Sequence, residues 1–330
     1  MGVHIIALPF RRMEPRPRFS CSGPERGLVS PIGADRQRRR STGASVSPGL
    51  MALTRRLRIF SRWLTGSRNG VSTRSLAKFL TGPTCAAESR QYIEAITETD
   101  DDVVVRLRGV ERPLYWPRGA SLYPLYMVLA ETLNPENWHY YEVPETRVGK
   151  DDVVADCGAA EGIFTLLVQS RAKRVYAIEP SPHWTASLTR TFDGAENVTV
   201  LPVAIGATAG EAYLAGGALD SVVSSAGRDG GHRVMVDTID RLFADVERPL
   251  TYLKADLEGF ELEMLEGARR TIARYRPKIA ITTYHRADHA ERIAAFLHDV
   301  EPSYRVRTKG IDADSGSPVM LHAWVPAGPS

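Results

Sequence analysis

The feature that most restricts the fold is a repeated order of short apolar runs and helix-like stretches after Gly149. Five apolar runs have the length of buried strands: Val153 to Ala155, Val175 to Ile178, Val198 to Val203, Tyr252 to Ala255 and Lys278 to Thr283. Helix-like stretches follow at Ile163 to Ser170, His183 to Phe192 and Glu261 to Tyr275. Repeated β-α-β units of this kind predict an α/β fold with a doubly wound parallel sheet, which binds ligands at the carboxyl ends of its strands.

Two further apolar runs, around Tyr304 to Arg307 and Val319 to Val325, have no obvious helix between them. They predict an antiparallel edge of the sheet. Residues 150 to 330 are therefore expected to form the main domain, and residues 84 to 149 an N-terminal cap. The cap contains a strand-like run, Val103 to Leu107, and a helix-like stretch, Ser121 to Leu133.

Charge separates the first 80 residues from the rest. They carry 16 Lys or Arg and 3 Asp or Glu, whereas the remaining residues carry 26 Lys or Arg and 36 Asp or Glu. Residues 1 to 50 mix Pro, Ser, Gly and Arg without apolar periodicity, which predicts a disordered basic tail. The tail either binds RNA or acidic lipid, or is dispensable or an upstream extension before Met51, and the second interpretation is favoured. Since the positive charge belongs to this part, the basic pI of about 8.7 is poor evidence for nucleic-acid binding by the main domain.

Residues 51 to 83 are predicted to form a basic amphipathic helix and a linker. Apolar residues recur at helical spacing among arginines: Leu53, Leu57, Phe60 and Leu64 beside Arg55, Arg56, Arg58 and Arg62. This helix packs on the body or a partner, or makes a peripheral membrane contact through residues 52 to 65. An aromatic cluster, Trp138 to Tyr141, either packs in the core or lines a substrate pocket, and core packing is favoured.

The three cysteines, Cys21, Cys85 and Cys157, show no pairing or metal-binding pattern, which favours a reducing compartment. The apolar runs are too short to span a bilayer, and no signal-peptide core follows the early arginines. We therefore expect a cytoplasmic protein.

Three carboxylates, Asp156, Glu179 and Asp256, each follow an apolar run, so the fold should bring them to one rim of the sheet. The first loop reads D-x-G-x-x-x-G: Gly158 permits a tight turn, and Gly162 begins the next helix. Asp156 and Glu161 make this loop acidic, which suits a cationic ligand with an amino-acid end better than a diphosphate. S-adenosylmethionine is such a ligand. Glu179 is placed to accept hydrogen bonds from ribose hydroxyls, a device that nucleotide enzymes share.

Five segments together resemble the FkbM family of S-adenosylmethionine-dependent methyltransferases: Val153 to Thr165, Val175 to Pro180, Asn197 to Gly206, Tyr252 to Ala268 and Pro277 to His285. The most specific is YLKADLEGFELEMLEGA. The resemblance implies a class I methyltransferase fold, whose seven-stranded sheet has an antiparallel last strand, and O-methylation of sugars or natural products. It also implies cofactor-binding residues, Asp156, Gly158, Ala160, Gly162, Glu179, Pro180, Val203 and Ala204. Of these, Val203 and Ala204 would lie near the adenine. The acidic Glu161 departs from the small or apolar residue usual in the family.

Methyl transfer requires an acceptor that is aligned and loses a proton. The candidate catalytic residues at the rim are His285, Asp256, Glu258 and Lys254. His285 is the first choice as base because an ordinary imidazole titrates near neutrality. A pairing role is favoured for Lys254, and Asp256 has an alternative role as N-cap of the helix from Glu261.

A divalent metal held by Asp256 and Glu258 is a less favoured alternative. The glycine-rich residues 215 to 231 are either a lid or an ordinary loop.

The sequence thus predicts an S-adenosylmethionine-dependent methyltransferase that acts on a hydroxyl of a sugar, glycan or natural-product small molecule, with no nucleic-acid partner. The alternatives are an N-methyltransferase and a non-catalytic S-adenosylmethionine-binding interaction module. A nicotinamide oxidoreductase is disfavoured because the loop lacks a third glycine.

Overall fold

The computed structural model describes residues 48–215, 222–224, 231–246 and 248–326. Residues 1–52 and 53–330 form two units, and the fold below is that of the second unit. The predicted disordered tail, residues 1 to 50, lies almost wholly outside the described residues. Most of the glycine-rich segment 215 to 231 also lies outside them, so its role as a lid stays a prediction.

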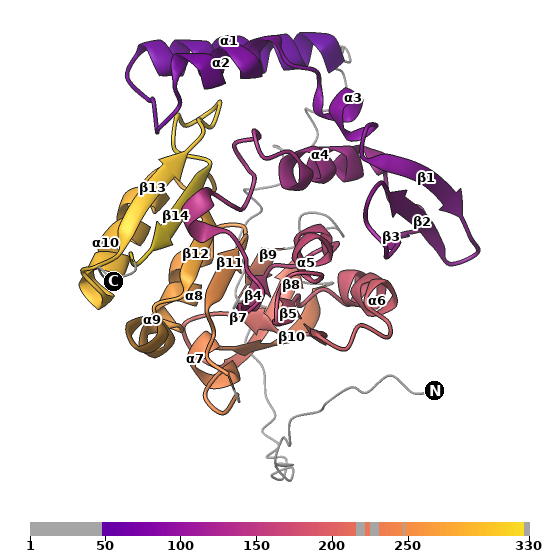
Figure 1. Ribbon diagram of the computed structural model, residues 1–330, viewed down its shortest axis with the longest axis vertical. Helices are drawn as coiled ribbons and strands as arrows, with labels where there is room; N and C mark the ends of the chain where they lie inside the picture. The colour runs from indigo at the N-terminus through magenta and orange to yellow at the C-terminus, as the bar shows by residue number, and fades with distance from the viewer. Residues whose placement is uncertain (1–47, 216–221, 225–230, 247, 327–330) are drawn as a thin grey trace, which may run out of the picture. The chain divides into compact units, whose positions relative to one another are not determined.

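A seven-stranded sheet forms the centre of the main domain (Figure 1). From edge to edge its strands are β13 (Arg305–Lys309), β14 (Met320–Trp324), β12 (Lys278–Thr282), β11 (Tyr252–Ala255), β4 (Val153–Cys157), β5 (Arg174–Ile178) and β6 (Val198–Leu201). The five strands from β12 to β6 are parallel, and β14 is antiparallel to both its neighbours. A parallel sheet whose last strand inserts in the opposite direction has the class I methyltransferase topology, so the predicted fold class is confirmed.

The prediction that the last two strands form an antiparallel edge is confirmed, because β13 and β14 pair antiparallel at one edge of the sheet. Within this edge, β14 lies between β12 and β13. It pairs with β12 from Ile279 opposite Ala323 to Thr282 opposite Met320, and its residues 320–323 are buried. Burial on both faces is typical of an inner strand.

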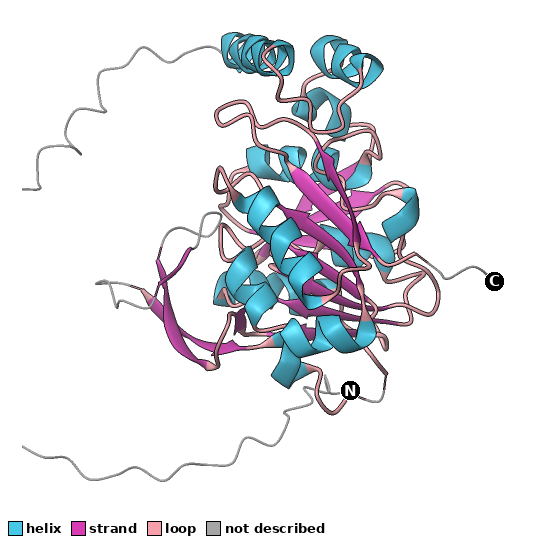
Figure 2. Cartoon of the chain, turned by 90° about the vertical axis from the view of Figure 1, so that its left-hand side faces the viewer, coloured by secondary structure: helices cyan, strands magenta, loops and turns pink. Residues whose placement is uncertain are grey.

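Helices cover both faces of this sheet (Figure 2). One core joins the sheet to α7 (Ile239–Leu242), α8 (Glu261–Glu266), α9 (Arg269–Tyr275) and α10 (His289–Val300). Two cores on the other face include α5 (Ile163–Val168) and α6 (Pro182–Thr191), with α4 (Leu122–Leu133) packed on α5. Along β4, Val153, Ala155 and Cys157 enter the first core and Val154 the opposite one, as the two-residue period of a strand requires.

Two of the helices differ from the sequence prediction. The expected helix from Glu261 to Tyr275 is divided into α8 and α9 at Gly267 and Ala268. Helix α10 was not predicted, although Ile293, Phe296 and Leu297 enter the core at helical spacing.

Two smaller sheets flank the main one. The first is antiparallel and contains β1 (Ile93–Glu98), β2 (Asp102–Leu107) and β3 (Leu114–Pro117). The second contains, in spatial order, β7 (Ala204–Ile205), β10 (His232–Asp237), β8 (Gly210–Ala215) and β9 (Val222–Ser224). This second sheet was not predicted, and it lies in the sequence between the third and fourth parallel strands.

An N-terminal helical layer precedes these sheets. It contains α1 (Pro48–Leu64), α2 (Thr73–Thr81) and α3 (Cys85–Ser89). Within the second unit, Ile59 packs with Leu76, Trp138 and Ile311 in one buried cluster. A single 3-10 turn, Pro144–Thr146, leads from this region to β4. Among the described residues, no helix has the length and apolar character needed to cross a bilayer.

Candidate active site

Three neighbouring strands bring the predicted carboxylates together at one rim of the sheet. Strand β4 lies between β5 and β11, and all three run in the same direction. Asp156 is the fourth residue of β4, while Glu179 and Asp256 directly follow β5 and β11. The parallel arrangement therefore places all three at the carboxyl ends of the strands, where open α/β sheets bind ligands.

Asp156 forms a buried ion pair with Lys254. The Lys254 Nζ lies 2.9 Å from Asp156 Oδ1, and both side chains are almost fully buried. Thr165 Oγ1 donates to Asp156 Oδ2 over 2.7 Å, and Lys254 donates to the Gly158 carbonyl over 2.7 Å. Burial disfavours the charged lysine, but Asp156 and Asp256 outweigh it and raise its pKa. These contacts join β4, β11, the loop after β4 and helix α5. They agree with the pairing role that the sequence analysis favoured for Lys254.

The loop after β4 depends on close backbone approach. Gly158 has φ +70°, and a Cβ there would overlap the Asp256 carbonyl. Gly162 has φ +85° and precedes α5, where a Cβ would press on Leu188 and Phe192. Only glycine combines these backbone angles with such contacts. The two glycines thus set the path of the loop, and both predicted positions have a physical reason.

The half-buried Glu161 lies in the same loop. Burial raises its pKa to about 7, although the nearby Lys254 favours ionisation. Near neutrality, the group is therefore close to half protonated. A cationic ligand in the loop would favour its ionised form.

Glu179 connects this loop to helix α6. Its Oε2 accepts a hydrogen bond from the Ala160 N–H over 3.0 Å, and its Oε1 accepts one from the Ser181 N–H over 2.8 Å. Burial raises its pKa, and the two backbone donors partly oppose that shift. A carboxylate oxygen has two lone pairs, so both oxygens keep acceptor capacity for ribose hydroxyls.

An apolar cavity lies beside Glu179. Its lining combines four predicted residues with four others: Gly158, Pro180, Val203 and Ala204 with Ile178, Ile205, Leu257 and Phe260. Apolar walls suit a flat ring such as adenine, and a carboxylate at the edge suits a ribose. The residues present thus fit a nucleoside. The roles assigned to the predicted cofactor-binding residues stay predictions.

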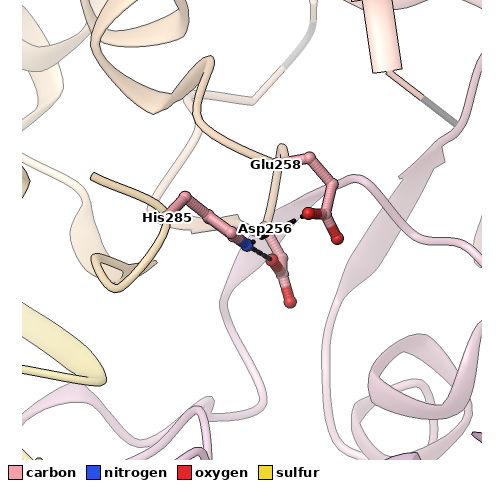
Figure 3. Close-up of side chains that lie close together, drawn as sticks. All are labelled: Asp256, Glu258 and His285. Atoms are coloured by element: carbon pink, nitrogen blue, oxygen red, sulfur yellow. Dashed lines mark ion pairs between the residues drawn. The ribbon is translucent and has the colours of Figure 1, made fainter. Parts of the chain in front are cut away.

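Asp256, Glu258 and His285 form a cluster at the same rim (Figure 3). The His285 Nε2 lies 3.3 Å from Glu258 Oε2 and 3.8 Å from Asp256 Oδ1. On the other side of the ring, Nδ1 lies 3.0 Å from Glu261 Oε1. Burial lowers the pKa of His285, but the bond to Glu261 and the surrounding carboxylates raise it to about 9. The expectation of a near-neutral histidine was therefore wrong, because its neighbours are acidic.

The structure also adds residues that sequence reasoning missed. Tyr141 donates its hydroxyl to Asp256 Oδ2 over 2.7 Å, and His139 Nε2 lies 3.7 Å from the same oxygen. Thr282, at the end of β12, donates to Asp256 Oδ1 over 3.0 Å. Burial raises the pKa of Asp256, but His139, Lys254 and His285 prevail and lower it. His139 and Tyr141 thus reach the rim, while Trp138 and Tyr141 also pack in buried clusters, as was favoured.

Asp256 does not cap the following helix. The N-cap residue of α8 is Phe260, and it makes no side-chain capping bond. The first-turn Glu261 instead folds back, and its Oε1 accepts from the Leu257 N–H over 3.0 Å. The capping alternative for Asp256 was therefore wrong.

A comparison with protein families gives one match that covers this rim. The sequence model of the "Methyltransferase FkbM domain" matches residues 156–305. Residues 156–305 are an FkbM methyltransferase domain. The predicted family is thereby confirmed for this part of the chain. No curated protein matches the chain.

Solved structures similar to the FkbM domain are distant. One is methyltransferase FkbM from Methylobacillus flagellatus KT, with 23% identity, coverage of 60% of this chain and 54% of that chain, and a TM-score of 0.43. Another is an rRNA methylase from Streptococcus thermophilus, with 13% identity, coverage of 55% and 90%, and a TM-score of 0.36. A third is a putative methyltransferase from Streptococcus mutans in complex with SAH, with 11% identity, coverage of 54% and 90%, and a TM-score of 0.36. The matched part thus spans about half the length of the first of these proteins.

Proposed function

We propose that this chain transfers the methyl group of S-adenosylmethionine to a hydroxyl of a sugar, glycan or natural-product small molecule. The supporting observation is the position of Leu257. It lines the apolar cavity, while its sequence neighbours Asp256 and Glu258 belong to the cluster with His285. The cavity proposed to hold the nucleoside and the cluster proposed to accept a proton are therefore adjacent, which supports methyl transfer to a hydroxyl.

The cavity and the acidic loop are proposed to hold the cofactor. Glu179 would accept from the ribose hydroxyls, and the apolar lining at Val203 and Ala204 would contact the adenine. The half-buried Glu161 would face the cationic methionine end. When bound, S-adenosylmethionine supplies a methyl group already activated by its sulfonium.

The cluster is proposed to hold the acceptor and take its proton. Because the pKa of His285 is about 9, its base form becomes populated only as the pH rises toward that value. In that form, with Nδ1–H bonded to Glu261, Nε2 presents its lone pair toward Asp256 and Glu258. A hydroxyl bound there would then have acceptors on three sides. The buried Glu261 keeps the imidazole ring oriented, which is the usual role of a carboxylate behind a catalytic histidine.

The cofactor test is isothermal titration with S-adenosylmethionine, its demethylated product and NADH. We expect both sulfur ligands to bind, and Glu179→Ala to weaken them by roughly tenfold or more, as for the loss of a hydrogen bond to a charged group. Glu196→Ala, which changes an exposed carboxylate elsewhere, should leave both affinities unchanged. Binding of NADH without binding of either sulfur ligand would refute the proposal.

The acceptor test supplies labelled S-adenosylmethionine with a panel of hydroxyl-bearing sugars, glycans and natural products, and identifies products by mass spectrometry. A methyl ether supports the proposal, whereas a methylamine product or no transfer to any acceptor counts against it. His285→Ala should keep cofactor affinity and lose methyl transfer by roughly 10²-fold.

A further inference from the structure

We propose that Asp256, Glu258 and His285 bind a divalent cation of the Mn²⁺ class at the rim of the sheet. Binding of the cation does not depend on the proposed function, but its catalytic role does. Two carboxylates and one imidazole suit a first-row divalent ion of intermediate hardness, since carboxylates favour Mg²⁺ and Mn²⁺ and imidazole favours the later metals. The structure thus changes the expectation from sequence, where a metal was not favoured.

The spacing of the three donors fits one ion. One ligand atom from each side chain lies within 4.8 Å of the other two. The closest approaches to His285 Nε2 are 3.3 Å from Glu258 and 3.8 Å from Asp256. Ligands at about 2.0 to 2.2 Å from a common ion are roughly 3 to 3.6 Å apart, so small side-chain adjustments complete the site. In Figure 3 the His285 nitrogen faces one carboxylate oxygen of Asp256 and one of Glu258.

His285 carries the second observation that points to a ligand. Its side chain is only 9% exposed, yet Nε2 is buried and makes no hydrogen bond among the described residues. Nδ1, on the other side of the ring, is bonded to Glu261 Oε1. Histidines that bind metals donate their second ring N–H to a carboxylate, which fixes the tautomer and aims the free nitrogen at the ion. His285 has the ring geometry that this requires, with Nδ1 against Glu261 and Nε2 toward Asp256 and Glu258.

The supporting residues are themselves held in place. The Oε1 of the fully buried Glu261 accepts from the N–H groups of Leu257 and Gly259. Asp256 accepts from Tyr141 and Thr282 on its two oxygens, which leaves one lone pair on each. Orientation of the first ligands by a second layer of hydrogen bonds is typical of built metal sites.

The site also has an open side toward an acceptor. The Glu258 side chain is 52% exposed, so the ion would keep coordination positions for oxygen atoms of the acceptor. A hydroxyl bound to the ion has a lowered pKa, and its O–H bond breaks with the proton passing to solvent. The oxygen then forms the new bond to the methyl carbon, while the carbon-sulfur electrons stay on sulfur. In this arrangement His285 is a ligand instead of the base.

The test is titration of the metal-free full chain with Mn²⁺, followed by the electron paramagnetic resonance signal of free Mn²⁺. We expect one saturable site per chain. Glu258→Gln and His285→Gln should each weaken binding by roughly tenfold or more, in line with the loss of a ligand or its orientation. The controls Glu94→Gln and His232→Gln change an exposed glutamate and an exposed histidine elsewhere and should bind normally.

Absence of saturable binding in the wild type would overturn the metal proposal, as would unchanged binding in both cluster variants. Glu258 is half exposed, so its variant should keep the fold even if the histidine variant does not. The proposal fails separately from the methyltransferase function. Full transfer activity in excess chelator with no Mn²⁺ site would refute the metal alone, and an Mn²⁺ site without binding of S-adenosylmethionine would refute the function alone.

A second, independent observation concerns helix α1, and from it we infer that residues 53–64 contact an anionic lipid surface. Four large apolar side chains on this helix are exposed, by 40% to 60%: Leu53, Leu57, Phe60 and Leu64. At 3.6 residues per turn they lie within an arc of about 60°. Ile59 and Trp63 occupy the other side and pack into the buried cluster with α2. The helix is thus apolar on both its packed and its outward side.

Charge favours a lipid surface over an uncharged partner. Residues 53–87 contain seven basic residues and no acidic one: Arg55, Arg56, Arg58, Arg62, Arg68, Arg74 and Lys78. Asp314 and Glu136 neutralise part of this charge, through ion pairs with Arg58 at 2.5 Å and with Lys78. A basic amphipathic helix with an exposed apolar stripe is the usual element that lies in a membrane interface.

The test is sedimentation of the full chain with phosphatidylcholine vesicles, with and without phosphatidylglycerol. We expect binding only to the anionic vesicles, and Leu57→Gln with Phe60→Gln should weaken it by roughly tenfold or more, given the apolar area lost. The control pair Tyr123→Gln and Met235→Gln changes exposed apolar residues elsewhere and should bind normally. Absence of vesicle binding, or binding to an RNA homopolymer in its place, would overturn the inference.

Discussion

Replacement of Lys254 by methionine should separate a structural from a catalytic role for this lysine. Its ammonium group lies 2.9 Å from Asp156 Oδ1 and 2.7 Å from the Gly158 carbonyl oxygen, in a region where both side chains are nearly inaccessible to water. Methionine has a similar length and no charge. The variant therefore keeps the volume and, among the residues that the structure describes, leaves the Asp156 carboxylate with the Thr165 hydroxyl as its side-chain donor.

The expected loss of stability follows from these contacts. At an effective dielectric constant of about 20, charges 2.9 Å apart attract by roughly 6 kcal/mol, most of which offsets the desolvation of the two ions. Removal of one partner from a buried pair costs roughly 3 to 5 kcal/mol, because the other charge stays buried. For a domain of this size, that corresponds to a decrease in Tm of roughly 5 to 9 °C. Lys173→Met, at an exposed lysine, should change stability by less than about 0.5 kcal/mol.

Chemical denaturation of Lys254→Met, Asp156→Asn and the double variant measures this pair directly. We expect the double variant to be more stable than the sum of the single losses predicts, by roughly 1 to 3 kcal/mol. Additive losses would contradict the ion-pair reasoning. A stable Lys254→Met variant that binds S-adenosylmethionine normally but lacks methyl transfer would instead assign Lys254 to catalysis.

Two other changes test the loop between Gly158 and Gly162. The pKa of Glu161 is about 7 in the folded chain, against an ordinary value of 4.5. Between these two pH values the folded chain therefore binds more protons than the unfolded chain. The folded state loses stability as the pH rises through this range. Glu161→Gln should remove that slope and gain up to roughly 3 kcal/mol above pH 7 in denaturant titrations, whereas Glu196→Gln should keep the wild-type slope. Gly158→Ala should lower the free energy of unfolding by several kcal/mol and abolish S-adenosylmethionine binding, because the new Cβ would overlap the Asp256 carbonyl. Its control is Gly109→Ala, at a similar φ in open space, which should lower it by only about 1 to 2 kcal/mol. Equal thermal stability of the two alanine variants would contradict the close-approach argument.

The parallel strands could be predicted because their signals are local. Each is a continuous apolar run followed by a polar residue, and Asp156, Glu179 and Asp256 all lie at the expected rim. The position of β14 could not be predicted in the same way. Its insertion between β12 and β13 depends on which strand edges are available after the rest of the chain has folded, and the sequence of the strand does not specify this.

The surroundings of the cluster were also beyond local reasoning. Tyr141 precedes Asp256 by 115 residues, and no spacing rule connects them. The pKa of His285 was misjudged for the same reason, since one of the acidic groups that raise it, Glu261, approaches only when β12 and α8 are packed together. The segment from Asp256 to Glu261 did contain a usable signal, because three acidic residues in six require charge compensation when buried.

The N-terminal helical layer has a consequence for biosynthesis. Residues of α1 contact a loop near the other end of the chain: Arg58 pairs with Asp314, and Ile59 shares a buried cluster with Ile311. These partners are about 250 residues apart in sequence, which the ribosome needs roughly 12 to 50 s to synthesise. During that time, Ile59 lacks its native neighbour Ile311. The four apolar side chains on the outward side of α1 are exposed as well, as they are in the finished fold. Helix α1 is therefore the segment of the nascent chain where we expect chaperones to bind longest.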